Sequence, residues 1–216
     1  WVLQNQVFGA WQSNPIIVDG VMYVTERPNS VMAVDAVTGR VYWKYRHQNA
    51  DNALVCCGAN NRGVAVLNDK VYMGTLDAHL VALDRVNGQL LWEAEVGDVN
   101  LAYSVTMAPL AVKDKILVGV GGGEFGIRGY VAAFNAETGE QAWKTYTIPG
   151  PGEANHDSWE GDDWEHGGAP VWITGSFDSD LNLTYWGVGN PGPDWNAGQR
   201  PGDNLYSDSA LSLIHI

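Results

Sequence analysis

Two adjacent cysteines, Cys56 and Cys57, are the residues of this 216-residue chain with the most distinctive chemistry. Neighbouring α-carbons lie about 3.8 Å apart, whereas a relaxed disulfide separates its α-carbons by about 4.4–6.8 Å. A bond between the two sulfurs would therefore close a strained, rigid ring, of the kind found where a stiff surface is needed. The sequence leaves a second interpretation open, in which both are small apolar residues of a buried strand.

Two oxygen-bearing side chains, Glu124 and Asn190, lie in long glycine-rich segments. A carboxylate and an amide carbonyl are hard donors that suit a calcium-like cation. The spacing also fits a simpler interpretation, a glycine-rich hairpin tip with one solvated glutamate.

Four further side chains are expected to point toward one place. Gln12, Arg62 and Thr106 each precede a hairpin by a similar distance, and Trp172 stands close to the equivalent point of a later hairpin. The fork of an arginine binds carboxylates in a bidentate manner. A rigid sulfur ring, a Trp plane, an Arg and small hydrogen-bonding groups would together make a slot for a flat, acidic, polar ring. Taken singly, Arg62 also fits a surface ion pair and Trp172 a core aromatic residue.

The elements that position these residues are repeats. Three segments share the pattern Ala-x-Asp/Asn-x-x-Thr/Asn-Gly-x-x-x-Trp, and they span residues 33–43, 82–92 and 133–143. Their terminal Trp residues are 49 and 51 residues apart, and a hairpin pattern precedes each segment. A period near 50 with strand-type alternation is typical of a four-stranded propeller blade. The sequence therefore predicts an all-β fold, a partial β-propeller of about four blades, with each Trp packed between neighbouring blades.

The repeats differ where function is expected. The third copy has a six-residue insertion within residues 121–129, and the matching loop of the fourth copy, residues 187–196, is longer again. Both insertions leave the same strand end, so Glu124 and Asn190 are expected on one face of the ring. We expect residues 1–210 to form the N-terminal part of one propeller domain and residues 211–216 to be a non-native or truncated end.

The composition narrows the classes of partner. The chain has 25 acidic and 12 basic residues and a net charge of −13. A nucleic-acid interface needs a basic face, so nucleic acid is not an expected partner. No apolar run reaches the roughly 20 residues of a membrane-spanning helix.

With these motifs together, the chain resembles the pyrroloquinoline quinone (PQQ)-dependent alcohol dehydrogenases of the methanol and ethanol dehydrogenase type. The motifs are Cys56-Cys57-Gly58 followed by Arg62-Gly63, the segment GGEFGIRG at 122–129 and the segment GNPGP at 189–193. The similarity runs from about residue 12 to residue 210, which is less than half of a family member. It implies an eight-bladed propeller with tryptophan-docking repeats.

The resemblance also implies roles at a PQQ site. Cys56 and Cys57 would form a vicinal disulfide over one face of the quinone, and Trp172 would stack on the other face. Arg62 and Thr106 would hydrogen-bond the carboxylates of PQQ. Backbone groups of three glycines would approach its edge: Gly121, Gly122 and Gly123.

A metal ion completes the implied site. Glu124 and Asn190 would ligate Ca²⁺, or a lanthanide as in some members, and the ion would polarise a quinone carbonyl as a Lewis acid. Gln12 departs from the Glu that methanol dehydrogenases have near the cofactor, and Gly121 replaces a Ser of some members. The catalytic Asp of the family would lie beyond Ile216, so no residue here takes that role.

One acidic loop invites comparison with such a base. It contains acidic residues beside two histidines, and we expect it to be a solvated loop edge: Glu160, Asp162, Asp163, His156 and His166.

The expected function is that of a periplasmic quinoprotein that oxidises an alcohol or aldehyde by hydride transfer to a metal-activated quinone. Its expected partners are a small alcohol, a cytochrome c or quinone electron acceptor, and the remaining blades of the propeller. The segment alone is expected to be poorly soluble and inactive. Alternatives are a non-catalytic scaffold propeller and a sugar-type quinoprotein; the cysteine pair argues against both, and the Gly-Gly-Glu segment also argues against the scaffold.

Overall fold

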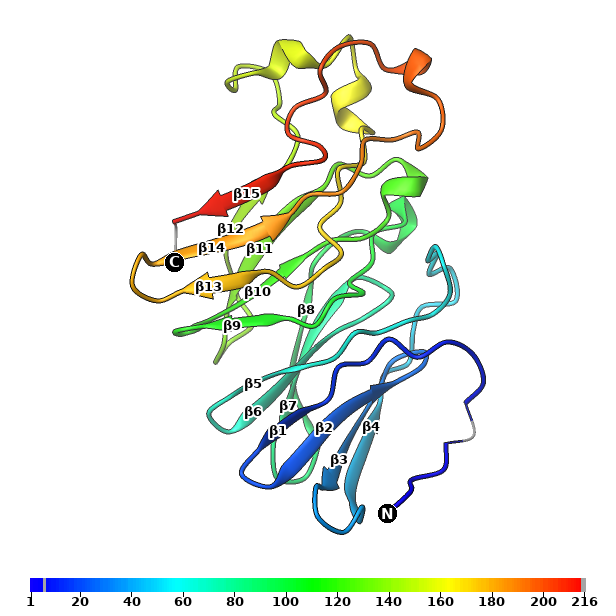
Figure 1. Cartoon of the computed structure of the whole chain (residues 1–216), viewed down its shortest axis with the longest axis vertical. Helices are drawn as coiled ribbons and strands as arrows, with labels where there is room; N and C mark the ends of the chain where they lie inside the picture. Colours follow the sequence, from blue (N-terminus) through cyan, green and yellow to red (C-terminus); the bar gives the residue numbers. More distant parts are fainter. Residues whose placement is uncertain (6, 215–216) are drawn as a thin grey trace.

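The computed structural model describes residues 1–5 and 7–214, which form four antiparallel sheets (Figure 1). The first contains β1 (Ile16–Val18), β2 (Val21–Glu26), β3 (Ser30–Asp35) and β4 (Val41–Arg46). The second contains β5 (Ala65–Leu67), β6 (Lys70–Gly74), β7 (His79–Asp84) and β8 (Leu90–Glu95). The third contains β9 (Leu110–Val112), β10 (Lys115–Gly119), β11 (Tyr130–Asn135) and β12 (Gln141–Tyr146), and the fourth β13 (Ser176–Asp178), β14 (Leu183–Gly187) and β15 (Ala210–Leu213).

The strands of every sheet follow chain order, and the four sheets follow one another along the molecule in Figure 1. Short 3₁₀ helices lie in the connections: η1 (Val99–Leu101), η2 (Gly123–Phe125), η3 (His156–Ser158), η4 (Asp163–Glu165) and η5 (Ala197–Gln199). The predicted all-β fold of about four propeller blades is therefore confirmed, and we call the four sheets blades 1 to 4.

The first hairpin illustrates how the sequence sets the strand register. Val18 pairs with Val21, so only Asp19 and Gly20 form the turn between β1 and β2. Their φ angles are 52° and 78°. Two-residue hairpin turns with positive φ at both positions match the twist of the flanking strands, and Asp-Gly favours them. The turn therefore fixes the pairing of β1 with β2 from the first residue of β2.

The repeated Trp residues join one blade to the next. The indole nitrogen of Trp43 in blade 1 donates to the carbonyl of Arg85 in blade 2 at 3.1 Å. Its ring lies directly over Gly88, where an added Cβ would come within 2.5 Å of it. Trp92 of blade 2 covers Gly139 of blade 3 in the same way, at 2.7 Å. Each glycine has a positive φ and leaves room for the ring, which explains the Thr/Asn-Gly of the repeat.

Trp1 makes the same contact, which the repeat pattern missed. Its indole nitrogen donates to the carbonyl of Ala36 at 3.2 Å, and its ring covers Gly39 at 2.6 Å from an ideal Cβ. The alignment did not identify Trp1 because no Thr-Gly segment precedes it. A tryptophan therefore covers the docking turn of blade 1 as well.

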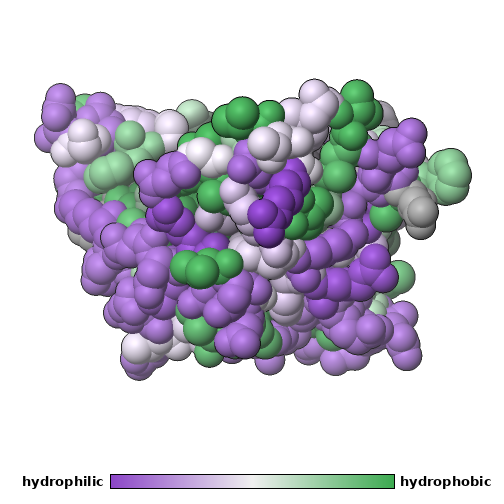
Figure 2. All heavy atoms as spheres, turned by 90° about the horizontal axis from the view of Figure 1, so that it is seen from below, coloured by the Kyte–Doolittle hydropathy of each residue, from purple (hydrophilic) through white to green (hydrophobic). Residues whose placement is uncertain are grey.

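Buried residues concentrate in the middle strands of each blade. β3, β6, β7 and β11 are almost wholly buried, whereas β4 and β8 alternate exposed and less exposed residues. Figure 2 shows one side of the molecule, where hydrophilic residues cover most of the surface and hydrophobic residues form separate patches. The described residues include no helix long and apolar enough to cross a membrane.

The last strand that the structure describes, β15, belongs to the three-stranded fourth sheet. β15 pairs with β14, and Leu213 lies opposite Thr184 with 7% of its surface exposed. Residues 215 and 216 lie outside the described residues. The prediction that residues 211–216 are a non-native or truncated end stays a prediction.

Candidate functional site

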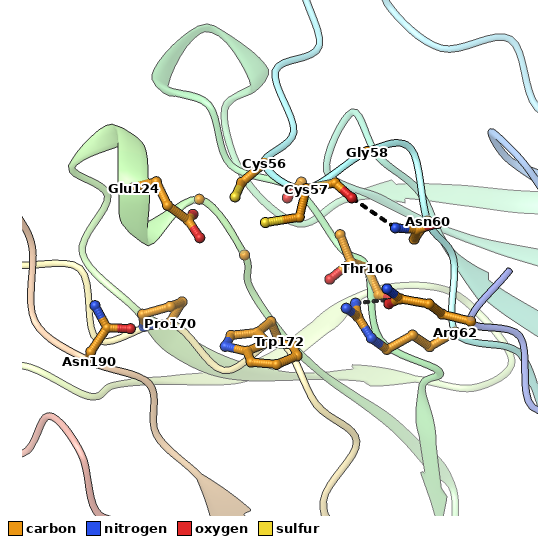
Figure 3. Close-up of a pocket in the computed structure, with 14 residues that line it drawn as sticks. Cys56, Cys57, Gly58, Asn60, Arg62, Thr106, Glu124, Pro170, Trp172 and Asn190 are labelled. Atoms are coloured by element: carbon orange, nitrogen blue, oxygen red, sulfur yellow. Dashed lines mark hydrogen bonds between the residues drawn. The ribbon is translucent and has the colours of Figure 1, made fainter. Parts of the chain in front are cut away.

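A cavity of about 400 Å³ opens where the blades converge (Figure 3). It brings together ten of the eleven predicted site residues: Gln12, Cys56, Cys57, Arg62, Thr106, Gly121, Gly122, Glu124, Trp172 and Asn190. Gly123 does not line the cavity, because it is buried against the ring of Pro170. Gln12 is exposed at the margin of the cavity.

Hydrogen bonds between the starts of successive blades explain why these residues converge. The backbone N–H of Asn14 donates to the carbonyl of Arg62, and the N–H of Arg62 donates to the carbonyl of Thr106, each at 3.0 Å. Ser104 and Gly121 exchange two further backbone bonds. The entering segments of blades 1, 2 and 3 are thus tied side by side, as the repeat register predicts.

The cysteine pair lies in the segment between β4 and β5. Both thiols are free in the structure, in contrast to the expected vicinal disulfide, which stays a prediction. Cys57 has a φ of 63°, and its carbonyl accepts a 3.0 Å hydrogen bond from the amide of Asn60. The pKa of the Cys56 thiol is raised to about 12 by its hydrogen bond with Cys57, by burial and by the neighbouring Glu124 carboxylate.

Trp172 lies across the cavity from the sulfurs of Cys56 and Cys57 in Figure 3. Its side chain is 42% exposed, so it is not the core aromatic residue that the sequence left possible. The indole and the two sulfurs border a space open to a flat molecule. Stacking on an aromatic face stabilises such a molecule in one plane.

Arg62 closes one end of this space. Its guanidinium carbon lies 4.9 Å from the centre of the Trp172 ring, and its Nη1 donates to the carbonyl of Thr106 at 3.3 Å. Burial lowers the pKa of Arg62, and Cys57 partly offsets that effect. Among the described residues Arg62 forms no ion pair, so its remaining donors are available to an anionic ligand.

Glu124 and Asn190 border the opposite end of the cavity. Glu124 belongs to η2, which the insertion of blade 3 forms, and Asn190 follows β14 of blade 4. The amide nitrogen of Asn190 donates to Asp194 at 2.8 Å and to the carbonyl of Pro191 at 3.2 Å. These bonds orient the amide, and its oxygen points toward the cavity in Figure 3. A carboxylate and an amide oxygen on one wall could hold a hard cation.

Two polar residues of the cavity were missed by sequence reasoning. Asn60 and Ser104 both line it, and the buried side-chain oxygen of Asn60 accepts no hydrogen bond from the described residues. Ser104 stands two residues before Thr106, and alternate residues of an extended segment share a face. That spacing could have identified Ser104; Asn60 depends on the shape of the turn after Cys57, which no pattern indicated.

The acidic loop remains outside the site. None of its five residues, Glu160, Asp162, Asp163, His156 and His166, lines the cavity in the described structure. His166 instead contacts the carbonyl of Gly126 through Nδ1 at 3.1 Å, and His156 contacts the carbonyl of Pro149 at 3.1 Å.

The cavity fits a flat anionic cofactor such as PQQ. A Cβ on Gly121 would lie 2.9 Å from the Ser104 hydroxyl, and one on Gly122 would lie 2.3 Å from the carbonyl of Ala102. Glycine at both positions therefore lets this segment pack closely against residues 102–104 beside the cavity. The donors of Arg62 supply polar contacts at one end of the cavity.

The blades and the hub cavity define a β-propeller with a site for a planar cofactor and a hard cation. A family model described as "PQQ: Glucose/ethanol/alcohol dehydrogenase, beta-propeller domain" matches residues 3–214. The chain belongs to this family of PQQ β-propeller dehydrogenases.

Relatives and solved structures agree with that assignment. The chain is 43% identical to the quinoprotein alcohol dehydrogenase PedH of Pseudomonas putida, over 94% of this chain and 36% of PedH. It is 39% identical to a lanthanide-dependent methanol dehydrogenase of Methylacidiphilum fumariolicum, over 96% of this chain and 38% of that protein. The structure of a europium-containing methanol dehydrogenase matches with a TM-score of 0.91 at 36% identity, over 98% of this chain and 41% of that one. The chain thus spans less than half the length of these relatives.

Proposed function

We propose that this chain forms the first blades of a PQQ-dependent alcohol dehydrogenase and carries one wall of its cofactor site. The observation that carries the proposal is the arrangement of Cys56 and Cys57 opposite Trp172, with Arg62 at one end of the cavity and Glu124 at the other. The named relatives support an alcohol as the substrate class.

Each wall has a separate task. Trp172 and the cysteine pair hold a planar ring between them and exclude water from its faces. Arg62 and the Thr106 hydroxyl donate to carboxylates at one end. Glu124 and Asn190 hold a cation, Ca²⁺ or a lanthanide, at the other end. PQQ, when bound with that cation, supplies the hydride-accepting carbonyl, and the chain supplies orientation and electrostatics.

The remaining parts of the function belong to the proposal as well. A carboxylate from a later blade serves as the base that takes the alcohol proton, and a cytochrome or quinone receives the electrons. A periplasmic location favours oxidation of Cys56 and Cys57 to the vicinal disulfide.

Binding of PQQ to the metal-free protein tests the proposal. Quenching of tryptophan fluorescence by PQQ, with and without added Ca²⁺ or La³⁺, gives the affinity and its metal dependence. Trp172→Ala is expected to raise the Kd about tenfold, because one stacking face is lost. Glu124→Gln is expected to abolish the effect of the metal, because it removes a charged ligand.

Trp195→Ala is the matched control, because Trp195 is 97% exposed and does not line the cavity. It should leave the Kd unchanged. Saturable binding that is equally strong in the Trp172 and Trp195 variants would place the cofactor elsewhere and overturn the proposal.

A further inference from the structure

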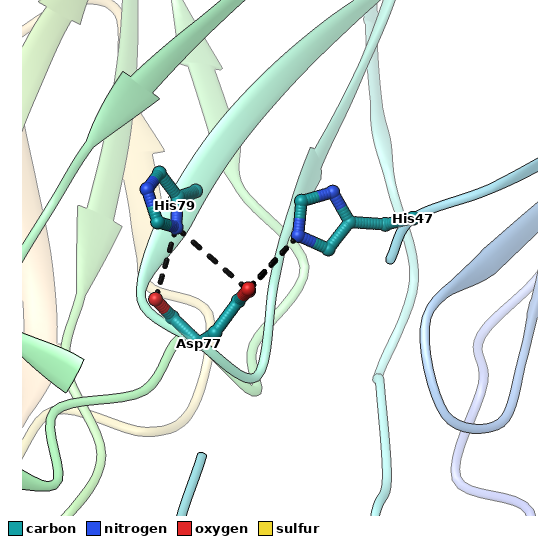
Figure 4. A group of neighbouring side chains, drawn as sticks. All are labelled: His47, Asp77 and His79. Atoms are coloured by element: carbon teal, nitrogen blue, oxygen red, sulfur yellow. Dashed lines mark hydrogen bonds and ion pairs between the residues drawn. The ribbon is translucent and has the colours of Figure 1, made fainter. Parts of the chain in front are cut away.

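A second group of metal-binding side chain types lies apart from the cavity and joins two blades (Figure 4). His47 follows β4 of blade 1, Asp77 lies in the turn between β6 and β7 of blade 2, and His79 begins β7. One ligand atom from each of the three lies within 4.8 Å of the others. None of the three lines the cavity described above.

The distances within this group are close to those of a metal site. Nε2 of His47 lies 3.0 and 3.1 Å from the two carboxylate oxygens of Asp77. Nδ1 of His79 lies 3.8 Å from the nearer of these oxygens. Ligands on a tetrahedral Zn²⁺, with bonds of about 2.0–2.2 Å, lie roughly 3.4 Å from one another. Small rotations of the rings would therefore bring all three atoms to bonding distance of one ion.

The second nitrogen of each imidazole faces an orienting partner. Nδ1 of His47 lies 3.5 Å from the hydroxyl of Tyr45, and Nε2 of His79 lies 3.9 Å from a carboxylate oxygen of Glu93. Metal-ligating histidines usually direct their other nitrogen to such a partner, which fixes the ring and its tautomer. Two imidazoles with this arrangement on one carboxylate are typical of a ligand set.

The Asp77 carboxylate is held but not saturated. One oxygen accepts from the Thr75 hydroxyl at 2.6 Å and the other from the backbone N–H of Ala50 at 2.9 Å. A carboxylate oxygen has about two acceptor sites, so each keeps one directed at His47. Asp77 is 3% exposed and His47 7%, whereas the His79 side chain is 28% exposed and gives a path from solvent.

We propose that His47, Asp77 and His79 bind one transition-metal ion, Zn²⁺ by the chemistry of the donors, and that this ion clamps blade 1 to blade 2. Imidazole suits Zn²⁺ and its neighbours, whereas Ca²⁺ prefers oxygen ligands alone. Water supplies the fourth ligand from the side of His79. Binding releases the proton of His79 Nδ1 and displaces its hydrogen bond with the carbonyl of Asp77, now 2.9 Å; one hydrogen bond is a small loss beside a metal–nitrogen bond.

Titration of the purified, chelator-treated protein with Zn²⁺ alone tests this proposal. We expect one bound ion per chain by calorimetry and metal analysis, with a rise in Tm because the ion joins two blades. His79→Gln should abolish that binding while leaving the circular dichroism spectrum unchanged. Glu93→Gln, which removes only the orienting partner, should weaken it about 10–100-fold.

A competing ligand set must be separated from this one. The sulfurs of Cys56 and Cys57 and the carboxylate of Glu124 also lie within 4.8 Å of one another and could hold Zn²⁺ when reduced. The double variant Cys56→Ser, Cys57→Ser should therefore keep the ion, and His166→Gln, outside both groups, should keep it too. Co²⁺ in place of Zn²⁺ should give visible d–d bands with no thiolate charge-transfer band.

The opposite pattern overturns the proposal. Binding that survives His47→Gln and His79→Gln and disappears in the double serine variant assigns the ion to the cysteines. Failure of the wild-type protein to take up Zn²⁺ would also overturn the proposal. Were the His79 variant to unfold, the Co²⁺ spectrum of the wild-type protein would still decide between nitrogen and sulfur ligands.

Discussion

Arg62 performs two tasks in one position. Its backbone ties the start of blade 2 to Thr106 of blade 3, and its guanidinium lies over the Trp172 ring. A planar, delocalised cation stacks on an aromatic face and still presents its donors along the edge. A lysine keeps the charge but neither the plane nor the fork.

Arg62→Lys is therefore expected to weaken PQQ binding about tenfold or more, since both stacking and bidentate donation are lost. The Kd from fluorescence titration measures the effect. Arg40→Lys is the matched control. Arg40 also lies over an aromatic ring, with its guanidinium carbon 5.8 Å from the centre of the Tyr42 ring, but it does not line the cavity. An equal loss in both variants would show that Arg62 has no specific part in binding.

At the residue scale, the spacing of residues in the repeats predicted which side chains come together at one cavity. It did not predict the individual contacts between them. The repeat register placed Glu124 and Asn190 on one face of the ring and brought Trp172 near Arg62 and the cysteines, because insertions and strand starts recur at fixed positions; that Trp172 faces the cysteines was implied only by the family resemblance. The contact between Arg62 and Trp172 joins two blades that are not adjacent in the chain, so no local pattern could indicate it. The same reason hid His47, Asp77 and His79, which become neighbours only when blades 1 and 2 pack together.

At the scale of elements, the tryptophan contacts between neighbouring blades are expected to contribute to stability. Trp43 covers Gly88, and Trp92 covers Gly139, in successive junctions. The repeat predicted that the Trp residues pack between blades. It did not predict their target, because the conserved Gly of the repeat also fits an ordinary tight turn.

Gly88→Ala tests that target. An added methyl group would lie 2.5 Å from the Trp43 ring, so we expect the variant to lose about 1–3 kcal/mol of unfolding free energy beyond the cost of its positive φ. Gly152→Ala is the matched control, because Gly152 has a φ of 84° and nothing within 4 Å of an ideal Cβ. Denaturant titration of both variants separates the two costs; equal losses would mean that backbone strain, not the Trp43 contact, explains the effect.

Across the molecule, blade 2 presents a charged pair, Asp77 and His79, at its junction with blade 1. Burial opposes ionisation of Asp77, but hydrogen bonds from His47, Thr75 and Ala50 and the nearby His79 ring outweigh it and hold its pKa below the ordinary 3.8. The Asp77 carboxylate, 3.8 Å from Nδ1 of His79, raises the pKa of His79 above its ordinary 6.5, against the opposing effect of burial. At a pH between the ordinary 6.5 and the raised folded pKa, the folded protein therefore holds a proton on His79 that the unfolded chain has released.

This difference sets the direction of a pH effect. The contribution of His79 is complete below its unfolded pKa and is lost as pH rises through its raised folded pKa. In the presence of a chelator, we expect the free energy of unfolding to fall as pH rises from the ordinary histidine pKa of 6.5 through the raised folded pKa of His79, and to fall less in His79→Gln. His166→Gln should retain the wild-type dependence; an unchanged slope in His79→Gln would remove His79 as its source.

The docking turns and the cavity lie at opposite ends of the strands. In blades 1 to 3 the connection from the second to the third strand and the segment that enters the first strand share one end, and the turn from the third to the fourth strand lies at the other. Trp43 and Trp92 seal their neighbours at this second end. Loops at the cavity end can therefore differ in length without disturbing the contacts between blades. Residues 121–129 and 187–196, which are longer than the matching loops of the first two repeats, are examples. Exchange of these two loops between members should for that reason leave the contacts between blades intact.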